Sequence, residues 1–152
     1  MNYDYVVFDI NMETTNAPNS ETDSVIDSVT DTILKFSSKI YFVITQDLAS
    51  IGASIQSRQI MRKSSVPVND FRFVLNRYDS KCKLTKKGIE DWLKVKIDLV
   101  LEDKHREVID SNYLGLPLVL HTKDKDVKKF YKSVELDIIE PKNKKNKKNK
   151  KK

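Results

Sequence analysis

The sequence has little glycine and cysteine, and it has no long apolar run. Its three glycines are Gly52, Gly88 and Gly115, and none stands in the G-x-x-x-x-G-K-[ST] pattern that cradles nucleotide phosphates. The single cysteine, Cys82, excludes an internal disulfide and fits a reducing compartment; with two histidines it disfavours a structural zinc site. No apolar run reaches the roughly 18–20 residues needed to span a bilayer. We therefore expect a cytoplasmic α/β domain without a phosphate loop of its own.

Acidic side chains are missing from the last eleven residues, which carry eight lysines. These residues, 142–152, account for the basic character of the chain, because without them the net charge changes from +6 to −2. Eight lysines separated only by asparagine repel one another and offer no apolar surface, so we expect a disordered tail over residues 141–152. The tail could contact anionic lipid or nucleic acid non-specifically. It lacks the aromatic and arginine side chains that read a nucleic acid sequence.

Apolar runs predict several strands in the remaining residues. The clearest lie at residues 39–45 and 71–76, and a short run at 5–9 ends in an acid. Two weaker runs lie at 97–101 and 118–121. Because these runs are nearly continuous rather than alternating, they indicate a sheet that is covered on both faces and mainly parallel.

Amphipathic stretches alternate with the strands. We expect helices behind the N-caps Ser20, Asp47 and Thr85, one that ends near Gly115, and one over residues 127–134. This β-α order implies right-handed crossovers and a three-layer α/β fold with helices on both faces of the sheet. In such folds ligands bind at the carboxyl ends of the strands.

Polar residues follow three of the predicted strands, and each fits two interpretations. Asp9 could hold metal-bound water beside a phosphate, or it could cap the following loop. Asn76 could hydrogen-bond the edge of a base, or it could stabilise its own turn. Residues 102–107 could surround a ligand, or they could form the solvated start of a helix. His105 and Cys82 are weaker candidates for chemistry, because no partner is tied to either by sequence.

Four segments in order resemble a known family. They are Y-D-Y-V-V-F-D at 3–9, I-Y-F-V-I-T-Q-D at 40–47, F-V-L-N-R-Y-D at 73–79 and Y-L-G-L-P-L-V at 113–119. The chain resembles the C-terminal portion of the MinD/ParA superfamily of P-loop ATPases, and within it the CpaE-like branch of Flp/Tad pilus assembly. The resemblance covers residues 3–134 and makes residues 1–140 a partial ATPase domain.

The resemblance implies a doubly wound parallel sheet that binds MgATP, often dimerises and positions cargo on a membrane or nucleoid. Asp9 matches the Walker B-type acid, which holds Mg²⁺ through water. Asn76 matches the asparagine that recognises adenine, and Arg77 follows it. Glu102 and Asp103 match the loop that closes over the base.

The sequence also departs from the family. The given sequence does not contain the family's deviant phosphate loop with its two lysines. Asn11 and Glu102 stand where the family usually has proline. We therefore expect a truncated or degenerate domain that acts as an interaction or positioning module in pilus, secretion or conjugation machinery. MgATP would bind only if an upstream segment or a partner supplied a phosphate loop. A protein partner or a homodimer is implied, together with a location in the cytoplasm or at the periphery of the inner membrane.

Two other functions fit parts of the sequence. V-V-F-D-I-N-M-E-T at 6–14 resembles the nucleophile strand of haloacid-dehalogenase-like phosphatases, although Asn11 replaces their second aspartate. The basic tail alone fits a protein that binds nucleic acid or a membrane.

Overall fold

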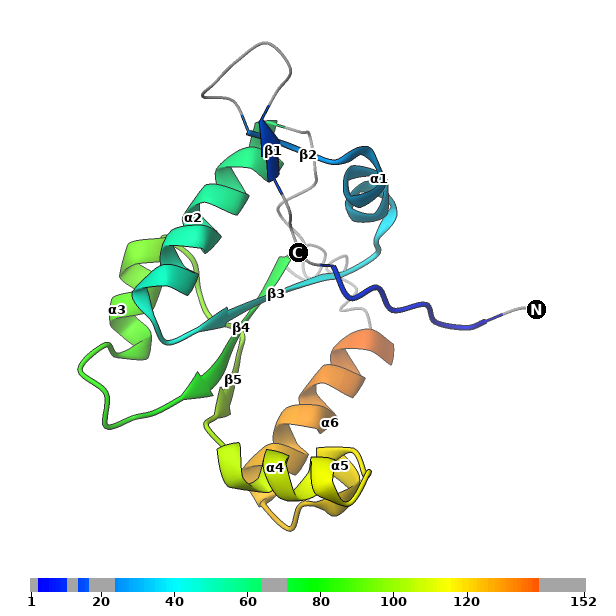
Figure 1. Cartoon of the computed structure of the whole chain (residues 1–152), viewed down its shortest axis with the longest axis vertical. Coiled ribbons are helices and arrows are strands. Elements are labelled where there is room, and N and C mark those ends of the chain that lie inside the picture. Colours follow the sequence, from blue (N-terminus) through cyan, green and yellow to red (C-terminus); the bar gives the residue numbers. More distant parts are fainter. Residues whose placement is uncertain (1–2, 11–13, 17–23, 64–70, 140–152) are drawn as a thin grey trace, which may run out of the picture.

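A computed structural model describes residues 3–10, 14–16, 24–63 and 71–139 (Figure 1). Strands and helices alternate through most of this part of the chain. In order they are β1 (Thr14–Asn16), β2 (Ser24–Ile26), α1 (Ser28–Phe36), β3 (Ile40–Thr45), α2 (Leu48–Lys63), β4 (Phe71–Tyr78), α3 (Lys86–Leu93), β5 (Leu99–Glu102), α4 (His105–Tyr113), α5 (Leu118–His121) and α6 (Lys125–Ile139).

The main sheet has the strand order β3-β4-β5, and both pairings are parallel. Ile40 pairs with Phe71 and Thr45 with Asn76, so β3 and β4 run side by side without a shift. β5 joins β4 through Leu99, which pairs with Val74. β1 and β2 form a separate antiparallel pair. The predicted α/β fold with a mainly parallel sheet is confirmed.

The core lies between the sheet and helices α2 and α3. Ile44 and Leu75 pair across β3 and β4, and both are fully buried against Ile51 of α2 and Ile89 of α3. A neighbouring cluster joins Phe71 and Phe73 of β4 to α1 and the end of α2. Burying each such side chain contributes about 1.5–3 kcal/mol to folding, so this face holds the three strands together.

Helix α6 covers part of the opposite face of the sheet (Figure 1). Val127 at its start is fully buried, and Phe130 and Tyr131 are half-buried. This agrees with the amphipathic pattern predicted over 127–134. The coverage ends before the middle of β3, where the side chain of Val43 is 57% exposed.

Two predicted helix starts are confirmed by hydrogen bonds. The amide of Gly88 donates to the Thr85 hydroxyl over 3.2 Å, and the amide of Ser50 donates to the Asp47 carboxylate over 2.7 Å. Helix α1 begins later than predicted, at Ser28, because Asp27 accepts hydrogen bonds from the first turn. Ser20, the predicted cap, lies outside the described residues.

The strand predicted at residues 118–121 is wrong. Those residues form the short helix α5, in which the amide of His121 donates to the carbonyl of Pro117 over 3.2 Å and that of Thr122 to Leu118 over 2.8 Å. The backbone groups of these residues are therefore paired within the helix and not with a neighbouring strand. In the described residues no helix is both long and apolar enough to cross a membrane.

The strand predicted at residues 5–9 is also wrong. Residues 3–10 run without secondary structure, and the side chains of Val6, Val7 and Phe8 are exposed. A strand exists only when a neighbour completes its hydrogen bonds, and none of the described strands pairs with this segment.

Candidate functional site

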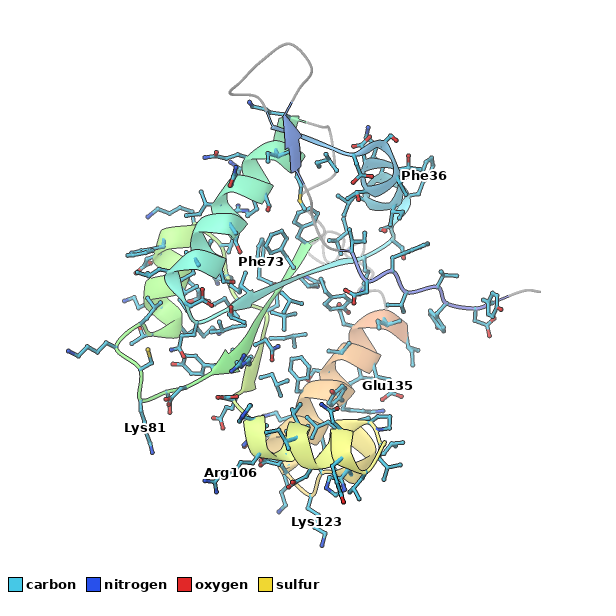
Figure 2. All side chains as sticks on the ribbon, in the orientation of Figure 1. Phe36, Phe73, Lys81, Arg106, Lys123 and Glu135 are labelled. Carbon is cyan, nitrogen blue, oxygen red and sulfur yellow. The ribbon has the colours of Figure 1, made fainter. Side chains whose placement is uncertain are left out.

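Three loops meet at the carboxyl ends of the parallel strands. They follow Thr45 at the end of β3, Tyr78 at the end of β4 and Glu102 at the end of β5. Figure 2 shows Lys81 at the tip of the loop after β4 and Arg106 on α4, both directed away from the ribbon. This edge therefore gathers Asn76, Arg77, Glu102 and Asp103, as the sequence predicted for parallel strands.

Arg77 has a strained backbone. Its φ is 55°, in the left-handed region that side chains other than glycine rarely occupy. Its amide donates to Oδ1 of Asn76 over 3.0 Å, and its Nε lies 3.8 Å from Oδ1 of Asp103. The carbonyl of Tyr78 also accepts from the amide of Asp103 over 3.0 Å. Asn76, Arg77 and Asp103 thus form one connected group across β4 and β5.

Gln46 holds the loop after β3 against the loop after β4. Its Oε1 accepts from the amide of Asp79 over 2.8 Å, and its Nε2 donates to the carbonyls of Asp79 and Leu84 over 3.1 Å and 2.5 Å. Gln46 was not among the predicted site residues. The only signal was its position directly after a strong strand.

Asp47 stabilises the start of α2. The Thr45 hydroxyl donates to its Oδ2 over 2.5 Å, and the amide of Ser50 donates to its Oδ1. These hydrogen bonds, the one from Thr45 first, lower the pKa of Asp47 below its usual value. Both oxygens accept hydrogen bonds and the pKa is lowered, so Asp47 is poorly suited to proton transfer at neutral pH.

Lys104 joins the loop after β5 to α6. Its ammonium lies 2.7 Å from Asp124 and 3.5 Å from Glu102. The hydrogen bond with Asp124 raises the pKa of Lys104 and lowers that of Asp124. Asp124 also accepts from the amides of Asp126 and Val127, so it caps α6. This ion pair could not be predicted from sequence, because its partners lie twenty residues apart and many other charged residues stand between them.

The structure does not bring Asp9 to this edge. Its neighbour Phe8 lines a cavity with Ser38 and Lys39, just before β3, and its other neighbour Ile10 packs in the cluster that contains Phe71. Both contacts lie at the amino ends of the strands, whereas Asn76 lies near the carboxyl end of β4. Our expectation that Asp9 and Asn76 share one end of the sheet is therefore wrong.

The described site presents mainly hydrogen-bonding and charged side chains. His105 and Cys82 are exposed, and in the described ranges neither side chain is hydrogen-bonded to the side chain of an acid or base. The same part of the chain contains no group of three or more His, Cys, Asp or Glu side chains that could hold a metal ion. The arrangement offers an amide, a guanidinium and carboxylates, which can bind a polar ligand.

No protein-family model matches the sequence, and no curated protein matches it. Solved structures are similar in fold. A ParA-family ATPase from Chlorobium tepidum TLS superposes with a TM-score of 0.66 and 19% identity, over 72% of this chain and 46% of that chain. The MinD cell division protein of Aquifex aeolicus gives a TM-score of 0.59 and 17% identity, over 70% of this chain and 46% of that chain.

These comparisons establish the fold. The chain has the α/β architecture of part of a ParA- or MinD-like ATPase, and it matches less than half the length of those two proteins.

Proposed function

We propose that the chain is a truncated or degenerate MinD/ParA-like domain that acts as an interaction and positioning module. The setting we propose is pilus, secretion or conjugation machinery of the CpaE-like type, in the cytoplasm or at the periphery of the inner membrane. The observation that carries the proposal is the open side of the sheet at β3. A protein partner or a second copy of the chain would complete the domain there.

The β3 edge has the chemistry of an association surface. In the described residues β3 pairs only with β4, so half of its backbone N–H and C=O groups point away from the sheet without a strand to receive them. Val43 is 57% exposed, although its pairing partner Val74 is buried. Nearby in sequence, Phe36 at the end of α1 is 85% exposed. Apolar side chains beside an unpaired strand edge favour the addition of another chain.

Nucleotide binding has weaker support. The amide nitrogen of Asn76 could still donate to a base, since its Oδ1 is already used by Arg77. Phosphates need a backbone cradle and a lysine, and the sequence has no phosphate-loop motif. We therefore propose at most weak binding of MgATP, with a phosphate loop supplied by an upstream segment or a partner. Asp9 would reach its magnesium only if residues 3–10 moved on association.

The haloacid-dehalogenase-like alternative has no support in the geometry. Its nucleophile would be Asp9, which must stand at the end of a strand. The segment that carries Asp9 forms no strand and packs at the amino end of the sheet.

Site-specific photo-crosslinking tests the association. A photoreactive phenylalanine analogue replaces Val43 in the full chain, and in a matched control it replaces Val108, which is 40% exposed on α4. We expect a discrete crosslinked product from position 43 in the cells that express the protein, and little from position 108. A product with the mass of two chains identifies a homodimer, and any other mass identifies a different partner. If position 43 gives no more crosslinking than position 108, the proposal is wrong.

A further inference from the structure

Basic side chains gather on one side of the molecule. Helices α2 and α3 lie side by side on one face of the sheet, away from α6 (Figure 1). Residues 48–63 and 79–97, which form these helices and the segments on either side of α3, carry nine Lys and Arg side chains and three Asp and Glu side chains. The other described residues carry eleven and fourteen. The outer surface of residues 48–63 and 79–97, here called the α2–α3 face, is therefore positive on an otherwise acidic domain.

Five lysines of the α2–α3 face are exposed and form no ion pair with a described residue. They are Lys81, Lys83, Lys87, Lys94 and Lys96. Two of the three acids are already engaged. Glu90 lies 3.8 Å from Lys86 and accepts from the amide of Ile97 over 2.9 Å, and Asp79 accepts from the amide two residues on over 2.8 Å. The third acid, Asp91, is exposed. The face thus keeps an excess of positive charge that an outside anion can neutralise.

Two arginines of α2 extend this charge toward the end of α3. The guanidinium of Arg58 donates to the carbonyl of Leu93 and lies 5.4 Å from the centre of the Phe73 ring. Burial lowers the pKa of Arg58, and the positive charge of Arg62 lowers it further. Arg62 is exposed, and residues 48–63 contain no acid that could pair with it. The two helices therefore present one continuous positive surface.

The single tryptophan of the chain lies among these cations. The side chain of Trp92 on α3 is 56% exposed, although Ile89 and Leu93 beside it are buried. On α2, Leu48 and Ile55 are also exposed. Exposed aromatic and apolar side chains mixed with lysines are typical of surfaces that lie on a membrane, where the indole sits at the level of the headgroups. Lysines near such a surface are attracted by its anionic lipids.

We propose that the α2–α3 face binds the surface of an anionic lipid bilayer, with Trp92 at the headgroups and the five exposed lysines near the lipid phosphates. A bilayer suits this face better than a nucleic acid. The unpaired cations are mainly lysines, which act as point charges, whereas a nucleic acid strand stacks its bases on several aromatic side chains. The uneven distribution of charge also turns this side, and not the acidic remainder, toward an anionic surface.

The inference rests on the proposed location at the membrane periphery and does not involve the β3 edge. Residues 142–152 supply most of the attraction, because the chain without them has a net charge of −2. The α2–α3 face adds a second, weaker contact that sets the orientation of the domain on the bilayer.

The fluorescence of Trp92 in the full chain tests the proposal, because no other tryptophan contributes to it. Vesicles of phosphatidylglycerol and phosphatidylcholine are added at low salt, and vesicles of phosphatidylcholine alone are the lipid control. We expect the emission to move to shorter wavelength with the anionic vesicles only, and brominated lipids to quench it. Sedimentation with anionic vesicles without any change in emission overturns the proposal, and it leaves the peripheral location and the β3 association standing.

A charge-reversal variant and a matched control then locate the contact. Lys87→Glu with Lys96→Glu changes the α2–α3 face, and Lys123→Glu with Lys128→Glu makes the same change at exposed positions before and on α6. Both variants keep Trp92, so its emission without lipid also checks that they fold. We expect the first variant to need about tenfold more lipid or more for half of the shift, because each lysine near an anionic surface strengthens binding roughly fivefold. The control should need less than about threefold more. Equal lipid requirements overturn the proposal, as does a single-stranded oligonucleotide that quenches Trp92 when vesicles leave its emission unchanged.

Discussion

The phenol of Tyr41 in β3 donates a hydrogen bond to Oδ2 of Asp137, near the end of α6, over 2.8 Å. The ammonium of Lys39 lies 2.9 Å from the other carboxylate oxygen, and Nε of Arg72 lies 3.4 Å from Oδ2. Asp137 thus joins the last helix to the amino ends of β3 and β4. This junction holds the C-terminal part of α6 against the sheet.

Asp137→Asn should destabilise the protein. The change removes the negative charge that faces Lys39, Tyr41 and Arg72, and it leaves Arg72 only the longer contact with Asp98, at 3.7 Å. We expect a loss of about 2 kcal/mol in the free energy of unfolding, measured by urea denaturation. Asp91→Asn on α3, an exposed residue, is the matched control and should change it by less than about 0.5 kcal/mol. Equal midpoints for the two variants would show that the junction contributes nothing.

The same residue should make stability sensitive to acid. Burial raises the pKa of Asp137, but hydrogen bonds from Lys39 and Tyr41 outweigh it and hold the pKa below 3.8. A carboxyl group with a lowered folded-state pKa stabilises the protein above its unfolded pKa, and this contribution is lost as pH falls through the folded value. Urea midpoints should therefore separate the parent chain from Asp137→Asn at pH 6, and the difference should shrink as the pH falls below 3.8 and through the lowered folded-state pKa. A constant difference down to pH 2 would contradict this assignment.

Arg77→Gly should relieve backbone strain at the carboxyl edge. Glycine adopts a φ of 55° without steric cost, whereas arginine does not. Its pair with Asp103 is long and exposed, so its loss costs little. We expect thermal melting to rise or to stay unchanged, while Arg77→Ala, which keeps the strain and loses the pair, should melt lower. A Gly variant that melts below the Ala variant would show that the left-handed turn is not the source of strain.

Local patterns predicted most of the sheet and few of the site's contacts. The runs that became β3 and β4 are long and rich in β-branched and aromatic residues, so their type was clear from sequence. The run at 5–9 is shorter but also apolar, and it forms no strand because a strand needs a partner, which local sequence does not reveal. The strand predicted at 118–121 is the short helix α5, which Pro117 precedes. A segment of four residues is too short for its hydrophobic pattern to distinguish a helix from a strand.

In the site too, strand order predicted some features, whereas contacts between distant segments could not be predicted. Asn76 and Asp103 come together because parallel strands end at one edge, which their order along the chain predicted. Gln46 and the ion pair of Lys104 with Asp124 were not predicted, because single polar residues in loops follow no period. Their roles come from contacts between segments, and these depend on how α2, β5 and α6 pack.

The chain should not hydrolyse ATP above background. The phosphate loop provides most of the charge stabilisation in phosphoryl transfer, and the sequence lacks its motif. Phosphate release from MgATP by the purified chain, followed over hours, should match that of a buffer blank. Turnover that disappears in Asp9→Ala, but persists in the neighbouring control Asp4→Ala, would refute the prediction and require another cation in place of the loop lysine.

The lysine-rich segment should bind anionic surfaces without contributing to folding. Residues 142–152 lie outside the described part of the chain, so this prediction rests on the sequence. Eight lysines in eleven residues attract phosphates through many weak contacts, and such binding falls steeply with salt. We expect a chain that ends at Glu140 to melt at the same temperature as the full chain and to lose co-sedimentation with anionic vesicles. Full-length binding should also weaken strongly between low and physiological salt. A large drop in melting temperature on truncation would instead show that the lysines pack against the domain, and salt-independent sedimentation would show that binding is not electrostatic.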